Sequence, residues 1–157
     1  MNAALVEDIR ASENFVPELS LVAELDGRIV GHVMVSYTAL HDTATRHRIC
    51  MLSPLAVAPE FQGRGVGSEL VRAVVALVDA RSEPLIFLEG SPVYYGRLGF
   101  EYSVPHGIRV VLPDWAPPEA AQMIRLRNYD PSIRGVVVYP PAFDAANERE
   151  AELGKER

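Results

Sequence analysis

Three glycines, Gly63, Gly65 and Gly67, alternate with other residues in the segment from Gln62 to Ser68, which reads QGRGVGS. The apolar run from Leu55 to Val57 precedes this segment, and a helical pattern follows it at once. A glycine loop between a strand and a helix is an arrangement that binds phosphate, because the first N–H groups of the helix are free and its dipole favours negative charge there. Glycine also lets the ligand approach the backbone and tolerates positive φ. The segment therefore predicts a phosphate-binding loop.

Two common phosphate-binding motifs do not fit this segment. A P-loop ends in Gly-Lys-Ser or Gly-Lys-Thr, whereas Gly67 is followed by Ser68 and Glu69, with no lysine nearby. The dinucleotide fingerprint is Gly-x-Gly-x-x-Gly, and the spacing here is one residue shorter. Both comparisons argue against a nucleoside triphosphatase and against a dinucleotide-binding enzyme.

The order of residues from Gln62 to Gly67 resembles the Arg/Gln-x-x-Gly-x-Gly/Ala motif of the GNAT superfamily of N-acetyltransferases. Downstream, Pro84 to Glu89 is similar to the next strand of that fold, and Tyr95 to Phe100 matches its Tyr-x-x-x-Gly-Phe ending. The resemblance covers about Ser20 to Phe100. The run from Val138 to Phe143, together with the paired tyrosines before Gly96, makes the chain most similar to the YhbS-like bacterial branch.

This resemblance implies a direct transfer of acetyl from acetyl-CoA, the co-substrate, to an amine of a small molecule or protein. In the family, the strand before the loop bulges and pairs with the pantetheine arm, while the loop amides hold the pyrophosphate. The implied coenzyme-binding residues are Leu55, Ala56, Val57, Gln62, Gly63, Arg64, Gly65, Val66, Gly67, Ser68 and Tyr95. For Arg64, a charge-assisted bond to a phosphate and a solvent-facing position are equally compatible with the sequence.

Two residues are candidates for catalysis. The resemblance assigns Tyr95 as the acid that protonates the leaving thiolate; the alternative is an aromatic side chain packed beside Phe100. Glu89, where a strand should end, is the first candidate for a general base, and a solvated carboxylate is the alternative. The other candidates, which we interpret as packing residues, are His32, His47, Cys50 and Ser53. The four histidines are scattered, so no metal is predicted.

The helix after the loop is the element that must hold it in place. Val66, Leu70, Val74 and Val78 recur every four residues, which predicts a helix packed on a sheet. Asp26-Gly27 predicts a tight hairpin turn. We expect a helix over 2–13, a helix whose pattern runs from Val66 to Asp79, a helical turn over 91–99, a loop over 41–47, and strands over 21–25, 28–37, 48–58, 84–88 and 134–139. Residues 108–112 are a further candidate strand, and 117–121 begin a short helix or an extended arm into 123–126.

These elements agree with the fold that the family resemblance implies, which is an α/β fold with a mixed, largely antiparallel sheet and helices on both faces. Residues 1–143 are expected to form a single domain of this kind, followed by a charged tail over 144–157. Only 19 residues precede Ser20 and they contain one expected helix, so the first strand of the family is expected to be missing. Two alternatives to an enzyme that acts as a single chain therefore stay open. One is an acyl-CoA-binding module without turnover, and the other is an enzyme completed by a partner chain, for example in a homodimer.

Composition narrows the function classes further. The 157 residues carry a formal net charge of −6, which argues against a nucleic-acid-binding surface. Cationic substrates agree with this charge, although solubility is a sufficient explanation. A single cysteine, no basic leader and no apolar run of membrane-spanning length predict a cytoplasmic protein that does not insert in membranes.

Overall fold

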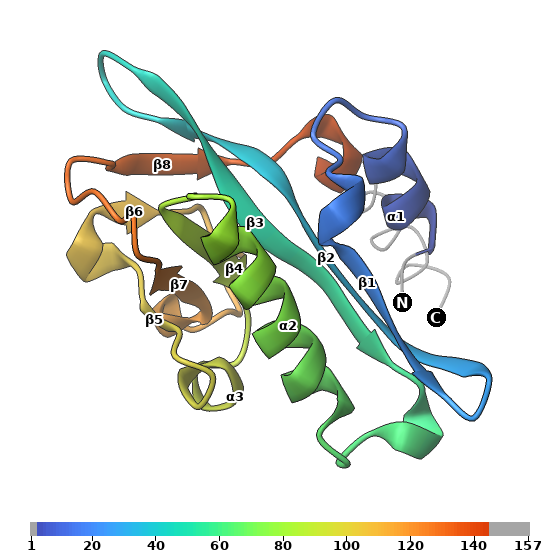
Figure 1. The fold of residues 1–157 in the computed structure, drawn as a ribbon. Coiled ribbons are helices and arrows are strands. Elements are labelled where there is room, and N and C mark those ends of the chain that lie inside the picture. Colours follow the sequence, from blue (N-terminus) through green and yellow to red (C-terminus); the bar gives the residue numbers. More distant parts are fainter. Residues whose placement is uncertain (1–2, 145–157) are drawn as a thin grey trace.

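The computed structural model describes residues 3–144, which build one mixed sheet with helices on both faces (Figure 1). The α-helices are α1 (Ala3–Arg10), α2 (Val66–Ala80) and α3 (Pro92–Gly96). The strands are β1 (Ser20–Leu25), β2 (Arg28–His41), β3 (Arg46–Val57), β4 (Leu85–Glu89), β5 (Glu101–Tyr102), β6 (Ile108–Arg109), β7 (Ala121–Arg125) and β8 (Gly135–Val138). Short 3-10 helices lie at Pro17–Leu19, Pro59–Phe61, Val104–His106 and Pro118–Ala120.

The sheet has eight strands in the order β5-β7-β4-β3-β2-β8-β6, with β1 paired to β2 beside this path. Two pairs, β3 with β4 and β6 with β8, are parallel, and all the other pairs are antiparallel. The predicted mixed, largely antiparallel sheet is therefore confirmed.

The hairpin predicted at Asp26-Gly27 joins β1 to β2. Asp26 has φ 50° and Gly27 has φ 78°, and two consecutive positive values are what a type I′ turn requires. The loop expected over 41–47 is wrong in extent, because β2 continues to His41 and β3 begins at Arg46, which pairs with it. The N–H of Asp42 donates to the carbonyl of Thr45 (2.9 Å) and closes the turn. The tip of this hairpin is exposed, so its residues are polar although the strands still pair there. Polar composition indicated exposure here and not the end of strand pairing.

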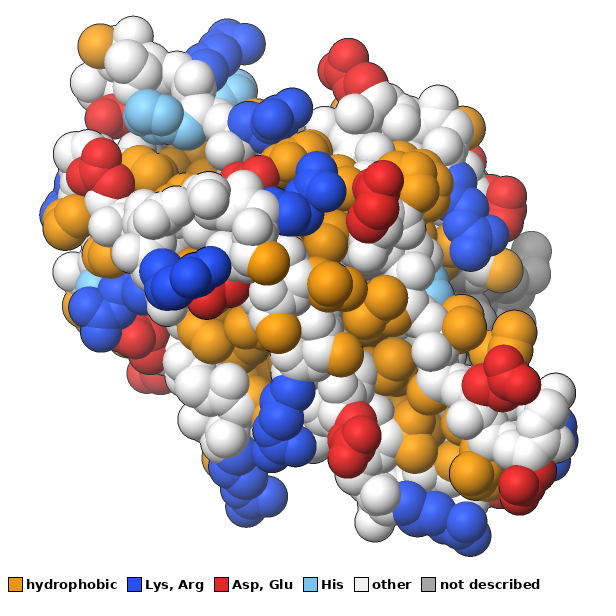
Figure 2. All heavy atoms as spheres, in the orientation of Figure 1, with side chains coloured by type: hydrophobic (Ala, Val, Ile, Leu, Met, Phe, Trp, Pro, Cys, Tyr) orange, Lys and Arg blue, Asp and Glu red, His pale blue; other side chains and the backbone are white. Residues whose placement is uncertain are grey.

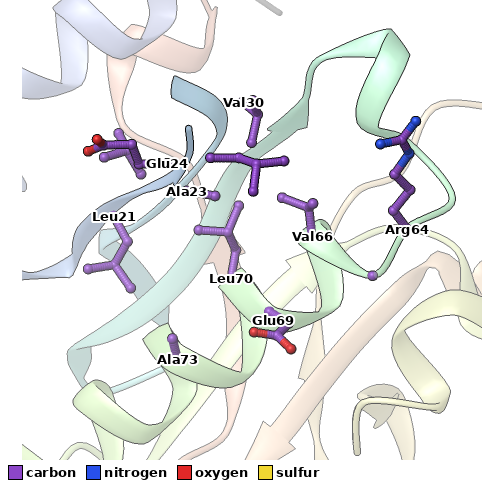
Figure 3. Close-up of a pocket in the computed structure, with 12 residues that line it drawn as sticks. Leu21, Ala23, Glu24, Val30, Arg64, Val66, Glu69, Leu70 and Ala73 are labelled. Atoms are coloured by element: carbon purple, nitrogen blue, oxygen red, sulfur yellow. The ribbon is translucent and has the colours of Figure 1, made fainter. Parts of the chain in front are cut away.

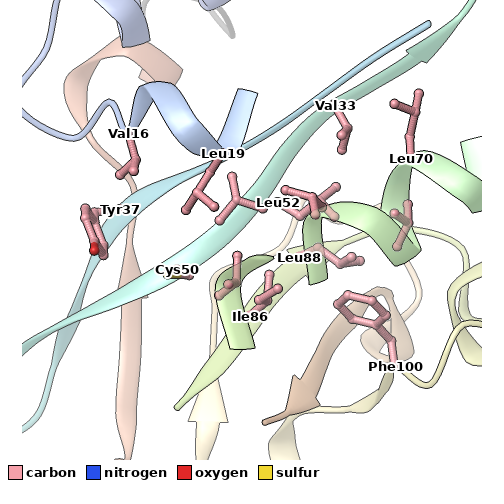
Figure 4. Close-up of a cluster of buried hydrophobic side chains, with 14 residues drawn as sticks. Val16, Leu19, Val33, Tyr37, Cys50, Leu52, Leu70, Ile86, Leu88 and Phe100 are labelled. Carbon is pink, nitrogen blue, oxygen red and sulfur yellow. The ribbon is translucent and has the colours of Figure 1, made fainter. Parts of the chain in front are cut away.

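Successive side chains of each strand point to opposite faces of the sheet, and each face has its own hydrophobic core. Val33 of β2, Leu52 of β3 and Leu88 of β4 pack with Leu70 and other buried residues of α2 on one face (Figure 4). The opposite face is covered in two places. There α1 packs Leu5, Val6 and Ile9 on Met34 of β2, while the C-terminal segments cover Phe87 and its neighbours. The prediction of helices on both faces is confirmed.

Within the sheet, β1 pairs with β2 alone, and no other described strand lies along its outer edge. The element before it is helical, as predicted, although α1 is shorter than the expected 2–13. Only two residues of the candidate strand over 108–112 pair, in β6, while β5 was not predicted. Both alternatives for the Pro117 region are present, one after the other: a short 3-10 helix comes first and β7 follows it. Residues 145–157 of the predicted tail lie outside the described residues, so the domain boundary remains a prediction.

Two leucines of α2 test how the helix is held on the sheet. Leu70 is buried against the core, whereas Leu77 is 41% exposed. We expect Leu70→Ala to lower the free energy of unfolding by about 2–5 kcal/mol and Leu77→Ala to lower it much less. Both variants replace leucine by alanine in the same helix, so the change in helix propensity is equal in the two. The difference between their free energies of unfolding, measured with urea, therefore reports the difference in packing. Equal losses in the two variants would contradict the seating of α2 described above.

Candidate active site

A gap opens in the middle of the sheet between β3 and β4. These parallel strands pair only through Cys50 with Ile86 and Met51 with Phe87. Beyond these pairs, the described residues contain no strand pairing between the end of β3 and the end of β4. One backbone edge of β3 therefore faces the gap, while its other edge stays bonded to β2.

A bulge in β3 lies where the strands part. Val35 of β2 pairs with Leu52, and Val33 pairs with Leu55, so Ser53 and Pro54 together lie opposite Met34. A bulge bends a strand, and proline, which has no N–H to donate, is found in sheets at bulges and edges. The bulge implied by the family resemblance is therefore present, directly before the run from Leu55 to Val57.

The glycine loop (Gln62–Ser68) connects β3 to the start of α2. Gly63 and Gly65 have φ 74° and 84°, a conformation that favours glycine, and no atoms lie within 4 Å of a Cβ built on either. Gly65 caps α2 without a side-chain hydrogen bond, and the amides of Val66, Gly67 and Ser68 have no acceptor within the described part of the chain. A cavity of about 390 Å³, the loop cavity, lies against these groups. Free amides, a helix N-terminus and open space meet the requirements of an anion site.

Gly67 needs to be glycine for a different reason. A Cβ built there would lie 2.7 Å from the hydroxyl oxygen of Tyr94, which also lines the loop cavity. From the sequence we interpret Tyr94 as structural, because only Tyr95 occupies the family position. The position of the Tyr94 hydroxyl beside the glycine loop is a feature that sequence reasoning missed.

Two side chains of the glycine loop contact neighbouring residues. Gln62 Nε2 donates to the carbonyl oxygen of Val57 (3.0 Å), which ties the loop to the end of β3. The Arg64 guanidinium lies 5.3 Å from the ring centroid of Phe61, and Arg64 is absent from the lining of the loop cavity. Gln62 therefore fixes the position of the loop, and the phosphate contact of Arg64 remains a prediction.

An apolar groove of about 410 Å³, the edge groove, runs between β1 and α2 beside the loop (Figure 3). Leu21 and Ala23 from β1 face Val66 and Leu70 from α2, and hydrophobic side chains reach the surface along it (Figure 2). On the same strand Val22 is 54% exposed. Among the described residues, an unpaired strand edge thus lies beside a mostly apolar groove.

Tyr95 belongs to α3 and lies beside the end of β4. Its ring packs on the backbone there, since a Cβ on Gly90 would lie 2.5 Å from its Cε2 atom, and its centroid is 5.7 Å from that of Phe100. Burial, with a smaller contribution from Tyr94, raises the pKa of Tyr95 to about 12. The hydroxyl has no hydrogen-bond partner among the described residues. Both sequence interpretations therefore describe part of its setting: the ring is packed and the hydroxyl can still donate.

Glu89 ends β4 with an exposed side chain, as predicted. Its carboxylate accepts a hydrogen bond from the hydroxyl of Tyr139, which follows β8. Burial, and then Glu89 itself, raise the pKa of Tyr139, so the phenol stays protonated and donates. Glu89 follows Phe87 on the face away from α2 and lines a second cavity with Ser53. Nothing local in the sequence could reveal Tyr139, which is fifty residues from Glu89.

The residues interpreted as packing are placed in different parts of the sheet. Cys50 is buried, and burial raises the pKa of its thiol to about 12. His32 bonds Ser20 through Nε2 (3.1 Å), and burial lowers its pKa. His47 bonds Thr45 in the long hairpin. Within residues 3–144, no group of three or more His, Cys, Asp or Glu side chains is arranged to hold a metal, and no helix has the length and apolar character needed to cross a membrane.

Residues 17–102, more than half of the chain, match the model of the acetyltransferase (GNAT) domain. The chain belongs to the GNAT acetyltransferase family. This GNAT chain is 35% identical over 99 residues to YjhQ, an uncharacterized N-acetyltransferase of Escherichia coli K12, a match that covers 63% of this chain and 55% of YjhQ. It spans about half the length of the curated relatives it matches.

Two solved GNAT structures share the fold. YhbS of Escherichia coli, in complex with CoA, has a TM-score of 0.74 and 27% identity, covering 89% of this chain and 76% of that one. A GNAT acetyltransferase of Brucella melitensis, in complex with acetyl-CoA, has a TM-score of 0.68 and 28% identity, covering 88% and 75%. These likenesses confirm the predicted fold class and the resemblance to the YhbS-like branch.

The raised pKa of Tyr95 can be tested directly. Because burial favours the neutral phenol, Tyr95 contributes stability that is complete below about pH 10 and is lost as the pH rises toward about 12. We expect Tyr95→Phe to remove an ionisation near pH 12 from the alkaline absorbance titration of tyrosine, and Tyr102→Phe to retain it. Loss of a step near the ordinary tyrosine value of about 10 in Tyr95→Phe would contradict the burial of this group.

Proposed function

We propose that the protein is an acetyl-CoA-dependent N-acetyltransferase that moves an acetyl group directly to an amine of a small molecule or protein. The observation that carries the proposal is the position of the glycine loop at the opening of the gap between β3 and β4. A phosphate site at one end of an unpaired strand edge suits a ligand that is a pyrophosphate joined to an extended amide arm. Acetyl-CoA has this form, and the solved relatives with CoA and acetyl-CoA support the choice.

Three parts of the coenzyme have proposed counterparts in the chain. The pyrophosphate would accept hydrogen bonds from the amides of Val66, Gly67 and Ser68, with the Tyr94 hydroxyl beside them. The pantetheine arm would lie along Leu55 to Val57 and take the place of a strand, because the edge of β3 there lacks a partner strand. The thioester would then lie in the gap, near the ends of β3 and β4.

The acceptor side lies on the other face of the sheet. The glycine loop leads into α2 on one face, whereas Glu89 and its cavity lie on the opposite face. This cavity begins at Met51 and Ser53 of β3 and at Glu89 of β4, beside the point where the two strands part. The amine would therefore reach the thioester from the face opposite to the one that α2 covers.

The proposed chemistry uses two side chains. A lysine-like amine has a pKa near 10.4, so holding it neutral at pH 7 costs about 4.6 kcal/mol. Glu89 would accept a proton from the amine, directly or through water, as general base. The neutral nitrogen bonds to the thioester carbonyl carbon, the C–S bond breaks, and Tyr95 gives its proton to the departing thiolate. The nitrogen then loses its second proton to water, and Tyr95 regains a proton from water. Tyr139 orients Glu89 through its hydrogen bond.

One alternative has a specific structural feature in its favour. The unpaired edge of β1 and the edge groove suit an enzyme completed by a partner chain, of which a homodimer is one form. A rise of specific activity with protein concentration would favour this arrangement. A binding module without turnover is the other alternative, and turnover separates it from the enzyme. The acidic net charge supports an amine rather than a nucleic acid as partner, and the reduced Cys50 supports a cytoplasmic location.

The glycine loop can be tested with one charged substitution. We expect Gly65→Glu to lower acetyl-CoA affinity roughly a hundredfold or more, because a carboxylate would occupy the proposed phosphate position. Gly27→Glu is the matched control, since Gly27 has a similar φ of +78° and equally open surroundings in the β1–β2 hairpin and does not line the loop cavity. Both variants carry a backbone cost of about 1–2 kcal/mol. Calorimetric titration checks affinity, and unchanged affinity in Gly65→Glu would refute the loop assignment.

The role of Tyr95 can be separated from its packing. We expect Tyr95→Phe to lower kcat roughly a hundredfold or more while leaving acetyl-CoA affinity near normal, because the ring and its contacts remain. Tyr102→Phe serves as the control for loss of a tyrosine hydroxyl elsewhere. Steady-state kinetics with a good acceptor, combined with the calorimetric affinity, provide the measurement. Full activity would show that Tyr95 only packs.

A further inference from the structure

The cavity on the face opposite α2, the far-face cavity, has features that select a ligand. It has a volume of about 620 Å³ and begins at Met51 and Ser53 of β3 and Glu89 of β4, where these strands part. Its other walls come from the segment after β6 and the segment after β8. Its size suits a small organic molecule, and its inner end lies where the proposed thioester would be.

Aromatic side chains form much of its wall. Tyr139 and Phe143 lie with ring centroids 5.4 Å apart, and Trp115 lines the cavity while being 85% exposed. Among the described residues, Trp115 contacts no other ring and no cationic side chain. A large aromatic surface exposed at a cavity opening marks a place where an apolar group binds.

The charged groups of the far-face cavity all have one sign. Glu89 and Asp144 line it, and none of the other described lining residues is Lys, Arg or His. Tyr139 already donates to Glu89, which fixes that carboxylate at the inner end of the cavity. A cationic ligand gains from both carboxylates, and aromatic faces also attract ammonium groups. A ligand carboxylate would meet two like charges and find no cation in this wall.

We propose that the far-face cavity is the acceptor pocket and takes a primary amine on an aromatic or bulky apolar body without a carboxylate. This inference rests on the proposed function. The amine group lies at Glu89, and the apolar body lies against Phe143 and Trp115. Transfer joins the amine nitrogen to the acetyl carbon and releases CoA as the thiol, with the amine proton taken up by Glu89. Free amino acids are disfavoured by their carboxylate, and short diamines lack the body that the aromatic wall contacts.

Trp115 is the single tryptophan of the chain, so intrinsic fluorescence reports on the cavity independently of turnover. The first experiment titrates the protein, with and without CoA, with three probes: 2-phenylethylamine, phenylalanine and 1,4-diaminobutane. Phenylalanine differs from the first probe only by its carboxylate, and the diamine has no apolar body. We expect a saturable change with 2-phenylethylamine at a Kd roughly tenfold or more below those of the other two.

Variants then assign the selectivity to named residues. We expect Asp144→Asn to reduce the preference for 2-phenylethylamine over phenylalanine several-fold, while Asp114→Asn, the same change beside the cavity lining, leaves it unaltered. We expect Trp115→Ala to raise KM for 2-phenylethylamine and to leave KM for acetyl-CoA unaltered.

Equal or tighter binding of phenylalanine or of the diamine would overturn the proposed substrate class. No fluorescence response to any of the three probes would overturn the pocket assignment, whether or not acetyl transfer is observed. A saturable response to 2-phenylethylamine without any transfer would support the pocket and contradict the proposed enzyme function, so failure of the two proposals can be told apart.

Discussion

The parting of β3 from β4 is the constraint on which the rest of the structure depends. Two parallel strands in the middle of a sheet normally bond along their length, because buried backbone groups need partners. Here they bond through two residue pairs and then separate at the bulge of Ser53 and Pro54. Under the proposed function, an extended ligand would complete the pairing of this edge. The glycine loop and Glu89 both lie beside this opening, one on each side of it.

Core packing sets the position of the glycine loop. The loop joins β3 to α2, and α2 is held by Leu70, Val71 and Val74 against the same sheet face that β3 supplies. Gln62 adds a direct bond from the loop to the end of β3. The free amides at the start of α2 are therefore held at a fixed place relative to the gap, and a ligand would not have to order them on binding.

Local patterns in the sequence were sufficient to predict much of this arrangement. The four-residue period of Val66, Leu70, Val74 and Val78 is a property of one helix. The hairpin turn at Asp26-Gly27 depends only on the positive φ values that these two residues can adopt. Contacts between distant segments could not be predicted this way. The bond of Tyr139 to Glu89 depends on the register of β8 beside β2, where a slip of one residue would turn every side chain to the other face. The predicted extent of the loop over 41–47 was wrong for a related reason, since polar composition does not show where strand pairing stops.

The part of the chain that matches the family model ends at residue 102, whereas the aromatic wall of the far-face cavity comes from Trp115, Tyr139 and Phe143. The matched stretch contains the glycine loop, the bulge and Tyr95 of α3. Most of the residues that would touch a second reactant follow that stretch. Substitutions in that later stretch would change which amine is accepted without disturbing the glycine loop. A transferase built in this way would keep one donor while changes confined to a single region altered its range of acceptors.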